Sequence, residues 1–231
     1  MLINLGCQTK FYNILLKIVN MKKALLLVGF ILVSTASYAQ QTAVTETGDM
    51  VILYDNGTWS YLHKDTIDAD DIPVNPERFY KSYNSHYLLK STRIKMGCYL
   101  DTLKWTFKKA NENEAAEYEI NNMALGLYGM MITEKLDLPL ESLANIALDN
   151  ARDAAADVKI TEKQYRYVNG LKVLMMRMTG TIQDIKFSYY GYYYSTPKGA
   201  TQFLVYSSED IVNNNIAEIE ELLNGLVEIN N

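Results

Sequence analysis

The sequence predicts an α+β fold, in which a mostly antiparallel β-sheet is flanked by helices in the order β-β-β-α-β-β-β-β-α. Three observations lead to this prediction. Four strand-like runs in the C-terminal half are joined by links of two or three residues, two segments have helical periodicity, and the central strands are apolar on both faces. Such short links require antiparallel neighbours, because a parallel crossover needs about a dozen residues.

The first three strands of the main domain are expected at 103–109, 116–120 and 127–134. Residues 103–109 (LKWTFKK) alternate apolar and polar side chains, as a half-buried strand does. A helix follows, with Pro139 suited to its first turn and Glu141 placed to complement the helix dipole. Its apolar face is predicted to consist of Leu140, Leu143, Ala144, Ala147, Ala151, Ala154 and Val158.

Four more strands are expected at about 159–167, 172–180, 185–195 and 200–206. Asn169-Gly170, Gln183-Asp184 and Pro197-Lys198-Gly199 link them as hairpins. A final helix is expected to start near Ser207 or Ser208, because Ser207 and Asp210 resemble a capping box. Its buried face is predicted to contain Val212, Ile216, Ile219, Leu222, Leu223 and Leu226.

Both faces of the sheet must be covered, because its central strands carry apolar side chains on both sides. In residues 171–179, Val173 and Met175 point one way, whereas Leu174 and Met176 point the other. We expect the two amphipathic helices to supply this cover, one on each face.

The N-terminal part of the mature chain, residues 40–62, reads as a small β-hairpin. Two strand-like runs, 49–54 and 58–62, flank Asp55-Asn56-Gly57, and Asn-Gly is a strong hairpin signal. Residues 63–78 are acidic, contain Pro73 and Pro76, and are interpreted as a linker. The linker's aspartates lack calcium-loop spacing. The main α+β domain is expected over residues 79–231.

Residues 1–39 are interpreted as upstream residues and a signal peptide, with Met21 as the true start. Lys22 and Lys23 form a basic region, residues 24–33 are apolar, and the segment ends in small residues at Ala39. The apolar run is about half the roughly 20 residues of a membrane-spanning helix. We therefore expect export to the periplasm or the extracellular space, without stable membrane insertion after cleavage.

The charge and cysteine content of the mature chain exclude several classes of function. Removing residues 1–39 removes four lysines and no acidic residue, which leaves 18 basic against 27 acidic residues. This balance disfavours nucleic acid as a partner. Cys98 is then the last remaining cysteine, so we expect no internal disulfide and interpret Cys98 as a small buried apolar residue.

The order of elements resembles the PsbP-like superfamily, which includes the PsbP subunit of photosystem II and the Ran-binding Mog proteins. The resemblance spans about 88–227 and rests on LPLESLANIALDNA, on VNGLKVLMMRMTG and on the tyrosine-rich IKFSYYGYYY. It implies a non-catalytic binding or assembly role and carries no site residue over. The DNGTW hairpin resembles an accessory element of secreted bacterial proteins.

The mature chain shows no motif for catalysis, metal binding or a cofactor. Its two histidines are His63, at the edge of the linker, and His86, near the start of the main domain. A hydrolase needs an activated nucleophile, a base and an orienting group. A small secreted hydrolase that uses His86 with a nearby serine therefore stays an alternative hypothesis.

Tyrosine is the unusual feature of the composition. Sixteen of the 18 tyrosines remain after Tyr12 and Tyr38 are removed, and five lie within 189–194. Strand alternation places Tyr190, Tyr192 and Tyr194 on one face, which we expect to be the more exposed, unless the C-terminal helix covers them. With Trp59 they form the predicted surface for a protein or carbohydrate partner.

We therefore expect an exported, non-enzymatic binding or accessory protein. A structural cell-surface component that packs through the Trp59 hairpin is a second alternative.

Overall fold

The computed structural model describes residues 41–45, 50–53, 57, 59–61, 72–111 and 115–229. The predicted signal peptide, the proposed start at Met21 and most of the linker, including His63, lie outside these residues. Among the described residues, no helix is long and apolar enough to cross a membrane.

The N-terminal residues form a separate three-stranded sheet in the order β1-β2-β3, with bounds Gln41–Val44, Met50–Leu53 and Trp59–Tyr61. β2 and β3 pair antiparallel, with Leu53 opposite Trp59, which confirms the predicted hairpin. Gly57 has φ of +81°, as the Asn-Gly turn requires. β1 adds a strand that the sequence pattern did not indicate.

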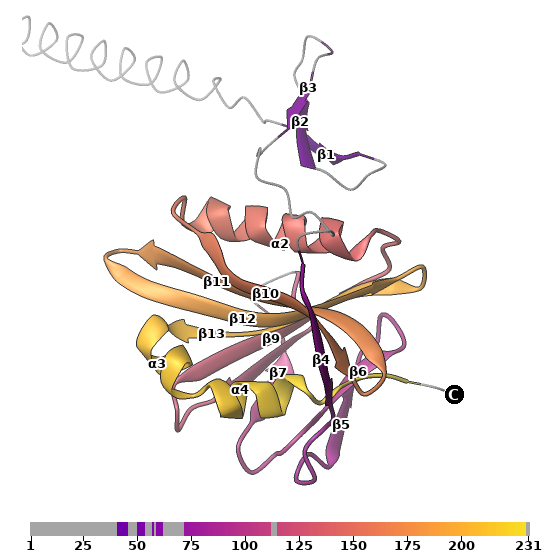
Figure 1. Cartoon of the computed structure of the whole chain (residues 1–231), viewed down its shortest axis with the longest axis vertical. Helices are drawn as coiled ribbons and strands as arrows, with labels where there is room; N and C mark the ends of the chain where they lie inside the picture. Colours follow the sequence, from indigo (N-terminus) through magenta and orange to yellow (C-terminus); the bar gives the residue numbers. More distant parts are fainter. Residues whose placement is uncertain are drawn as a thin grey trace, which may run out of the picture. The chain divides into compact units, whose positions relative to one another are not determined.

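The main domain is built on an eight-stranded sheet in the order β4-β10-β11-β12-β13-β9-β8-β7 (Figure 1). The strands are β4 (Val74–Phe79), β7 (Thr106–Lys109), β8 (Tyr118–Asn122), β9 (Leu127–Glu134), β10 (Lys159–Val168), β11 (Leu171–Ile182), β12 (Ile185–Thr196) and β13 (Gly199–Ser208). All neighbours pair antiparallel except β4 and β10, which are parallel. The predicted α+β class and its mostly antiparallel sheet are confirmed.

β4 corrects the predicted linker, because residues 74–78 belong to the sheet. The Tyr165 amide donates to the Pro73 carbonyl at 2.9 Å, and Ile72 is buried. An edge strand tolerates Pro76, since one side of such a strand makes no ladder bonds. The main domain therefore begins near Ile72 and not at Phe79.

Two further boundaries differ from the prediction at the other edge of the sheet. β7 begins at Thr106, because Leu103 lies in a turn and is 95% exposed, while Trp105 is buried. β8 begins at Tyr118, two residues after the expected start.

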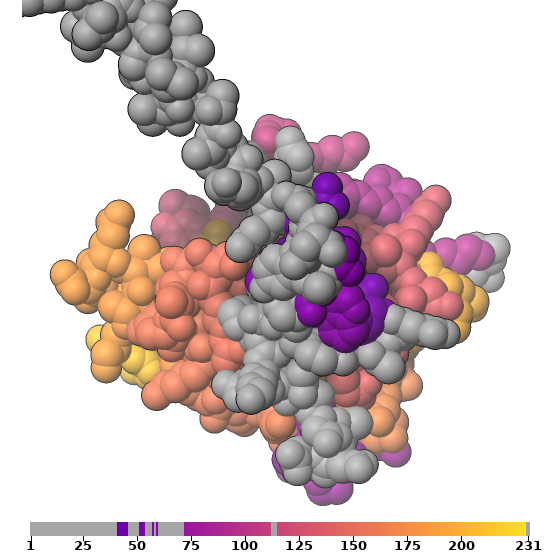
Figure 2. Space-filling model, turned by 90° about the horizontal axis from the view of Figure 1, so that it is seen from above, coloured from indigo at the N-terminus to yellow at the C-terminus, as the bar shows by residue number. Residues whose placement is uncertain are grey.

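The predicted hairpin links 169–170 and 183–184 of the long central strands are confirmed. Asn169 and Gly170 have φ of 50° and 87°, and Gln183 and Asp184 have φ of 50° and 65°. Both links are two-residue turns with positive φ, which match the twist of the flanking strands. The hairpin that joins β11 and β12 projects from the domain (orange in Figure 2).

One face of the sheet is covered by α2 (Leu140–Ala154), which follows Pro139 as predicted. α2 packs on β11 and β12. The helix ends before Val158, but Val158 is buried in the same apolar cluster.

The opposite face is covered by α3 (Glu209–Asn214), α4 (Ile216–Leu223) and a second, three-stranded sheet. The single predicted C-terminal helix is therefore broken at Asn215, and Leu226 lies in a strand. The predicted capping box is wrong. Ser207 still belongs to β13, and its hydroxyl donates to the Gly126 carbonyl at 2.7 Å.

The second sheet has the order β14-β6-β5, with bounds Leu226–Glu228, Met96–Leu100 and Tyr87–Lys90. It packs its apolar side chains into the same cluster as α4. Cys98 lies in β6 and is fully buried, as predicted. Burial raises the pKa of its thiol to about 12, so the thiol stays neutral.

Candidate functional site

The predicted exposed ladder of tyrosines is wrong at its centre. Tyr190 and Tyr192 are 2% and 0% exposed, and Tyr194 is partly buried against the same cluster. The C-terminal helices and the second sheet cover this face, which was the alternative left open by the sequence. Tyr190 and Tyr192 therefore offer no open surface to a partner.

The buried tyrosines belong to a polar network between the sheet and α4. Arg166 donates to Glu220 at 2.6 Å and to the Tyr192 hydroxyl at 3.1 Å. Tyr192 in turn donates to Asn224 at 2.9 Å, and Tyr190 donates to Glu220. Burial raises the pKa of Tyr192 to about 12, although the nearby arginine opposes the shift. Each hydroxyl is paired, so the network fixes the helix on the sheet.

A second buried polar cluster surrounds Glu117, just before β8. Its carboxylate accepts from the Ser91 hydroxyl at 2.6 Å, from the Thr92 amide at 2.6 Å and hydroxyl at 2.7 Å, and from the Thr133 hydroxyl. Burial alone would raise the Glu117 pKa, but these hydrogen bonds outweigh it and lower the pKa below its usual range. Such a carboxylate anchors the 91–94 turn and is a poor general base at neutral pH.

His86, the residue on which the hydrolase alternative depends, lies at the surface of the main domain. Its exposed ring stacks edge-on against Tyr83, with centroids 5.6 Å apart. The neighbouring Ser85 is buried, and its amide donates to the Ser82 carbonyl. Within the described part of the chain, no hydrogen bond joins His86 to a serine, and no cluster of three or more metal-ligating side chains occurs.

Trp59 lies on the N-terminal sheet with 54% of its surface exposed, and its cross-strand partner Leu53 is 38% exposed. Its role in a partner surface stays a prediction.

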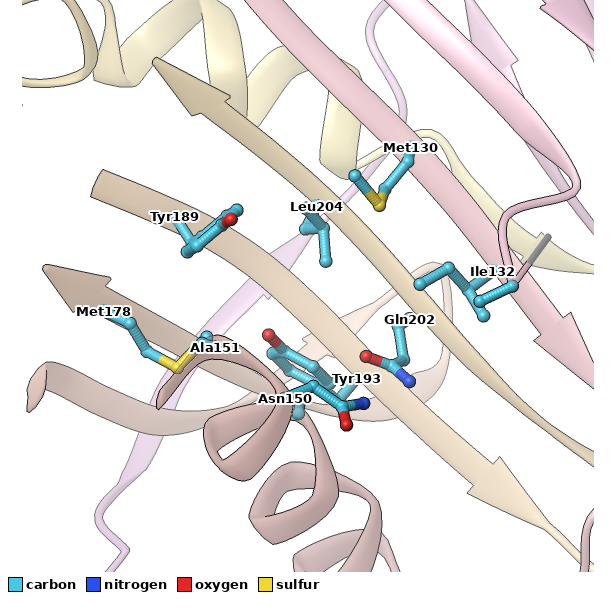
Figure 3. A pocket seen from close by; sticks show the side chains of 11 residues that line it. Met130, Ile132, Asn150, Ala151, Met178, Tyr189, Tyr193, Gln202 and Leu204 are labelled. Carbon is cyan, nitrogen blue, oxygen red and sulfur yellow. The ribbon is translucent and has the colours of Figure 1, made fainter. Parts of the chain in front are cut away.

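The strongest candidate site lies on the α2 side of the main sheet, where a pocket of about 410 Å³ opens between the helix and the strands (Figure 3). Its walls come from four strands, β9, β11, β12 and β13, and from the helix. They include Met130 and Ile132 of β9, Leu204 of β13, Met178 of β11 and Ala151 of α2. α2 packs on β11 and β12. The side chains of β9 and β13 therefore form the pocket wall on the part of the sheet next to the helix.

Three polar side chains line this pocket, and they differ in how deeply they are buried. Tyr193 is fully buried, and its hydroxyl has no hydrogen-bond partner among the described residues. Gln202 is 6% exposed, and Asn150 is exposed on α2. In Figure 3 the Tyr193 hydroxyl points toward Met178 and Tyr189, while the two amides lie on the other side of the Tyr193 ring in this view.

Strand alternation could have predicted part of this site, since it placed Tyr189 and Tyr193 on the face opposite Tyr190. The contributions of Gln202, Asn150 and Met130 depend on contacts between distant segments, and sequence reasoning missed them. The described residues that line the pocket carry no charge.

Comparison with known proteins gives matches among solved structures alone, since no family model and no curated protein matches this chain. The solution structure of cyanobacterial PsbP from Synechocystis sp. PCC 6803 has a TM-score of 0.48 and 7% identity. The matched region covers 64% of this chain and 94% of the cyanobacterial chain. This is a likeness of fold at low sequence identity.

Two further solved structures show weaker likeness. PA94 of Pseudomonas aeruginosa, a protein of unknown function, has a TM-score of 0.40 and 9% identity over 55% of this chain and 84% of its own. A crystal structure from Bacteroides thetaiotaomicron VPI-5482 has a TM-score of 0.39 and 9% identity over 59% of this chain and 46% of its own.

Proposed function

We propose that this chain is an exported, non-enzymatic binding protein that holds a small, neutral, mainly apolar molecule beside α2. The pocket between α2 and the sheet carries the proposal. Its volume of about 410 Å³ lies within the usual range for small-molecule sites, which are mostly apolar with a few placed polar groups. Export is supported by the leader in residues 1–39.

The composition of the pocket favours an uncharged ligand. A charged group in an apolar site needs a partner of opposite charge, and none of the described lining residues supplies one. Met130 and Met178 have flexible thioether side chains that adapt to ligands of different shape and contact aromatic rings favourably. An apolar ring or short chain would therefore gain most by leaving water for this pocket.

The test uses residues 40–231 and the neutral fluorescent probe N-phenyl-1-naphthylamine. Asn150→Trp places a large side chain at the pocket, whereas Asp153→Trp places the same side chain on an exposed position of α2 outside it. We expect saturable binding to the wild type and to Asp153→Trp, and at least a tenfold weaker affinity in Asn150→Trp. Absence of saturable binding, or equal binding in both variants, would overturn the proposal.

A second candidate, docking of a protein or carbohydrate partner through the N-terminal sheet, is favoured by the exposure of Trp59 and Leu53. Trp59→Ser should abolish surface attachment or partner capture while leaving probe binding beside α2 unchanged. Retention of attachment in this variant would exclude the candidate.

A further inference from the structure

We infer that the ligand of the α2 pocket carries a neutral oxygen acceptor, such as a carbonyl, which accepts a hydrogen bond from the Tyr193 hydroxyl. The inference rests on the binding function proposed above and names the chemical class of the ligand. That class is a ring or short chain with one carbonyl-type oxygen placed toward the Met178 and Tyr189 end of the pocket.

The first observation is the unsatisfied hydroxyl itself. Buried polar side-chain atoms in native proteins nearly always have a partner, so each exception needs an explanation. Tyr190 and Tyr192, on the same strand, each make a hydrogen bond through the hydroxyl. Tyr193 is equally buried and lines the pocket, yet its hydroxyl has no partner among the described residues.

The second observation is the protonation of Tyr193. Burial raises the pKa of its hydroxyl, and the nearby Tyr189 raises it further. The group therefore stays an O–H donor at neutral pH, and an acceptor atom is the partner that satisfies it best. A carboxylate would also accept, but the described pocket lining holds no cation to balance its charge.

The third observation is the separation of the polar groups in the pocket. In the view of Figure 3, the amides of Gln202 and Asn150 lie on the other side of the Tyr193 ring from its hydroxyl. A ligand with a single acceptor can therefore bind with that atom either at the Tyr193 hydroxyl or at the two amides. Removing each polar group separately measures which position it occupies.

The test compares two neutral probes of the same shape, acetophenone and α-methylstyrene, in which a CH₂ group replaces the carbonyl oxygen. Their affinities for wild type, Tyr193→Phe and Gln202→Leu are measured by NMR titration. Tyr87→Phe, an exposed tyrosine of the second sheet outside this pocket, is the control. Thermal unfolding of each variant verifies that it is folded.

We expect Tyr193→Phe to weaken acetophenone binding about two- to tenfold, the range of a single net hydrogen bond, and to leave α-methylstyrene binding unchanged. Gln202→Leu and Tyr87→Phe should leave the preference for acetophenone intact. If both probes bind but Tyr193→Phe affects them equally, or if Gln202→Leu removes the preference, the inference fails and the binding function stands. If neither probe binds the wild type, both fail.

Discussion

The two faces of the main sheet bury tyrosines from the same strand, β12, in different ways. On the face covered by α3, α4 and the second sheet, the hydroxyls of Tyr190 and Tyr192 are paired with Glu220 and Asn224. On the α2 face, the equally buried Tyr193 has no partner for its hydroxyl within the described residues and borders a pocket.

Burial alone therefore does not separate a structural tyrosine from a candidate binding tyrosine. The distinguishing feature is whether the polar end of the side chain is satisfied by the fold. On the face covered by α3, α4 and the second sheet, here called the closed face, Glu220 and Asn224 accept hydrogen bonds from the two hydroxyls. On the other face, Glu141 of α2 accepts from the hydroxyl of Tyr165, but no described residue accepts from Tyr193.

The largest effect is expected from truncating the closed face. Tyr192→Ala should lower the free energy of unfolding by about 3–5 kcal/mol, because it leaves a large cavity and removes the hydrogen bonds of Tyr192 with Arg166 and Asn224. Urea unfolding measures the change. Tyr83→Ala, at a tyrosine that is 86% exposed, is the control and should change stability by less than about 0.5 kcal/mol. Similar losses of stability in both variants would contradict the conclusion that Tyr192 is part of a tightly packed, hydrogen-bonded face.

Removing the cation of the closed-face network should have the next largest effect. Arg166→Met leaves Glu220 without its charged partner and should cost about 2–3 kcal/mol, below the full range for buried pairs because Glu220 is 26% exposed. Lys198→Met removes the exposed pair with Glu228 and should cost at most about 1 kcal/mol. Urea midpoints that coincide for both variants would show that the network does not hold α4.

Glu117 is a buried charged group whose carboxylate, like the hydroxyls of Tyr190 and Tyr192, is hydrogen-bonded within the fold. Its lowered pKa means that its contribution to stability is present above the usual carboxyl range and is lost as the pH falls through the folded-state pKa. Glu117→Gln should therefore cost about 1–3 kcal/mol at pH 7, and the difference from wild type should shrink in acid. Urea unfolding from pH 7 to pH 3 measures this, and a gap that widens in acid would contradict the assignment.

The smallest effect separates the two faces most directly. Tyr193→Phe removes an unpaired hydroxyl and should leave the ligand-free protein unchanged or stabilise it by up to about 1 kcal/mol. Tyr192→Phe, the matched change on the closed face, should destabilise by about 1–2 kcal/mol. Thermal and urea unfolding of the two variants measure these changes in stability. A loss of stability in Tyr193→Phe would show that its hydroxyl has a partner within the fold.

The elements that the sequence predicted well are those specified by neighbouring residues. β9 spans 127–134 as expected, and α2 follows Pro139 with the predicted apolar face except at Ala154, which is exposed because the helix ends there. The Asn169-Gly170 and Gln183-Asp184 turns have positive φ at both residues, because short links leave few other backbone solutions. Local propensity and periodicity agree at each of these positions.

The elements that the sequence missed depend on distant partners. β4 reads as an acidic, proline-containing linker, and it becomes a strand because the edge of β10 supplies its hydrogen bonds. β14 has three residues and pairs with β6, which lies more than a hundred residues earlier in the chain. Neither has a local pattern strong enough to identify it.

For the candidate site, alternation along β12 by itself determined that Tyr190 and Tyr192 share one face and that Tyr189 and Tyr193 share the other. It could not determine which face is closed, because both carry enough apolar surface to require cover. The tertiary structure decided this by breaking the C-terminal helix at Asn215 and placing the second sheet beside it. Helix α2 leaves the pocket beside it, and that geometry depends on packing between distant segments, which no short stretch of sequence encodes.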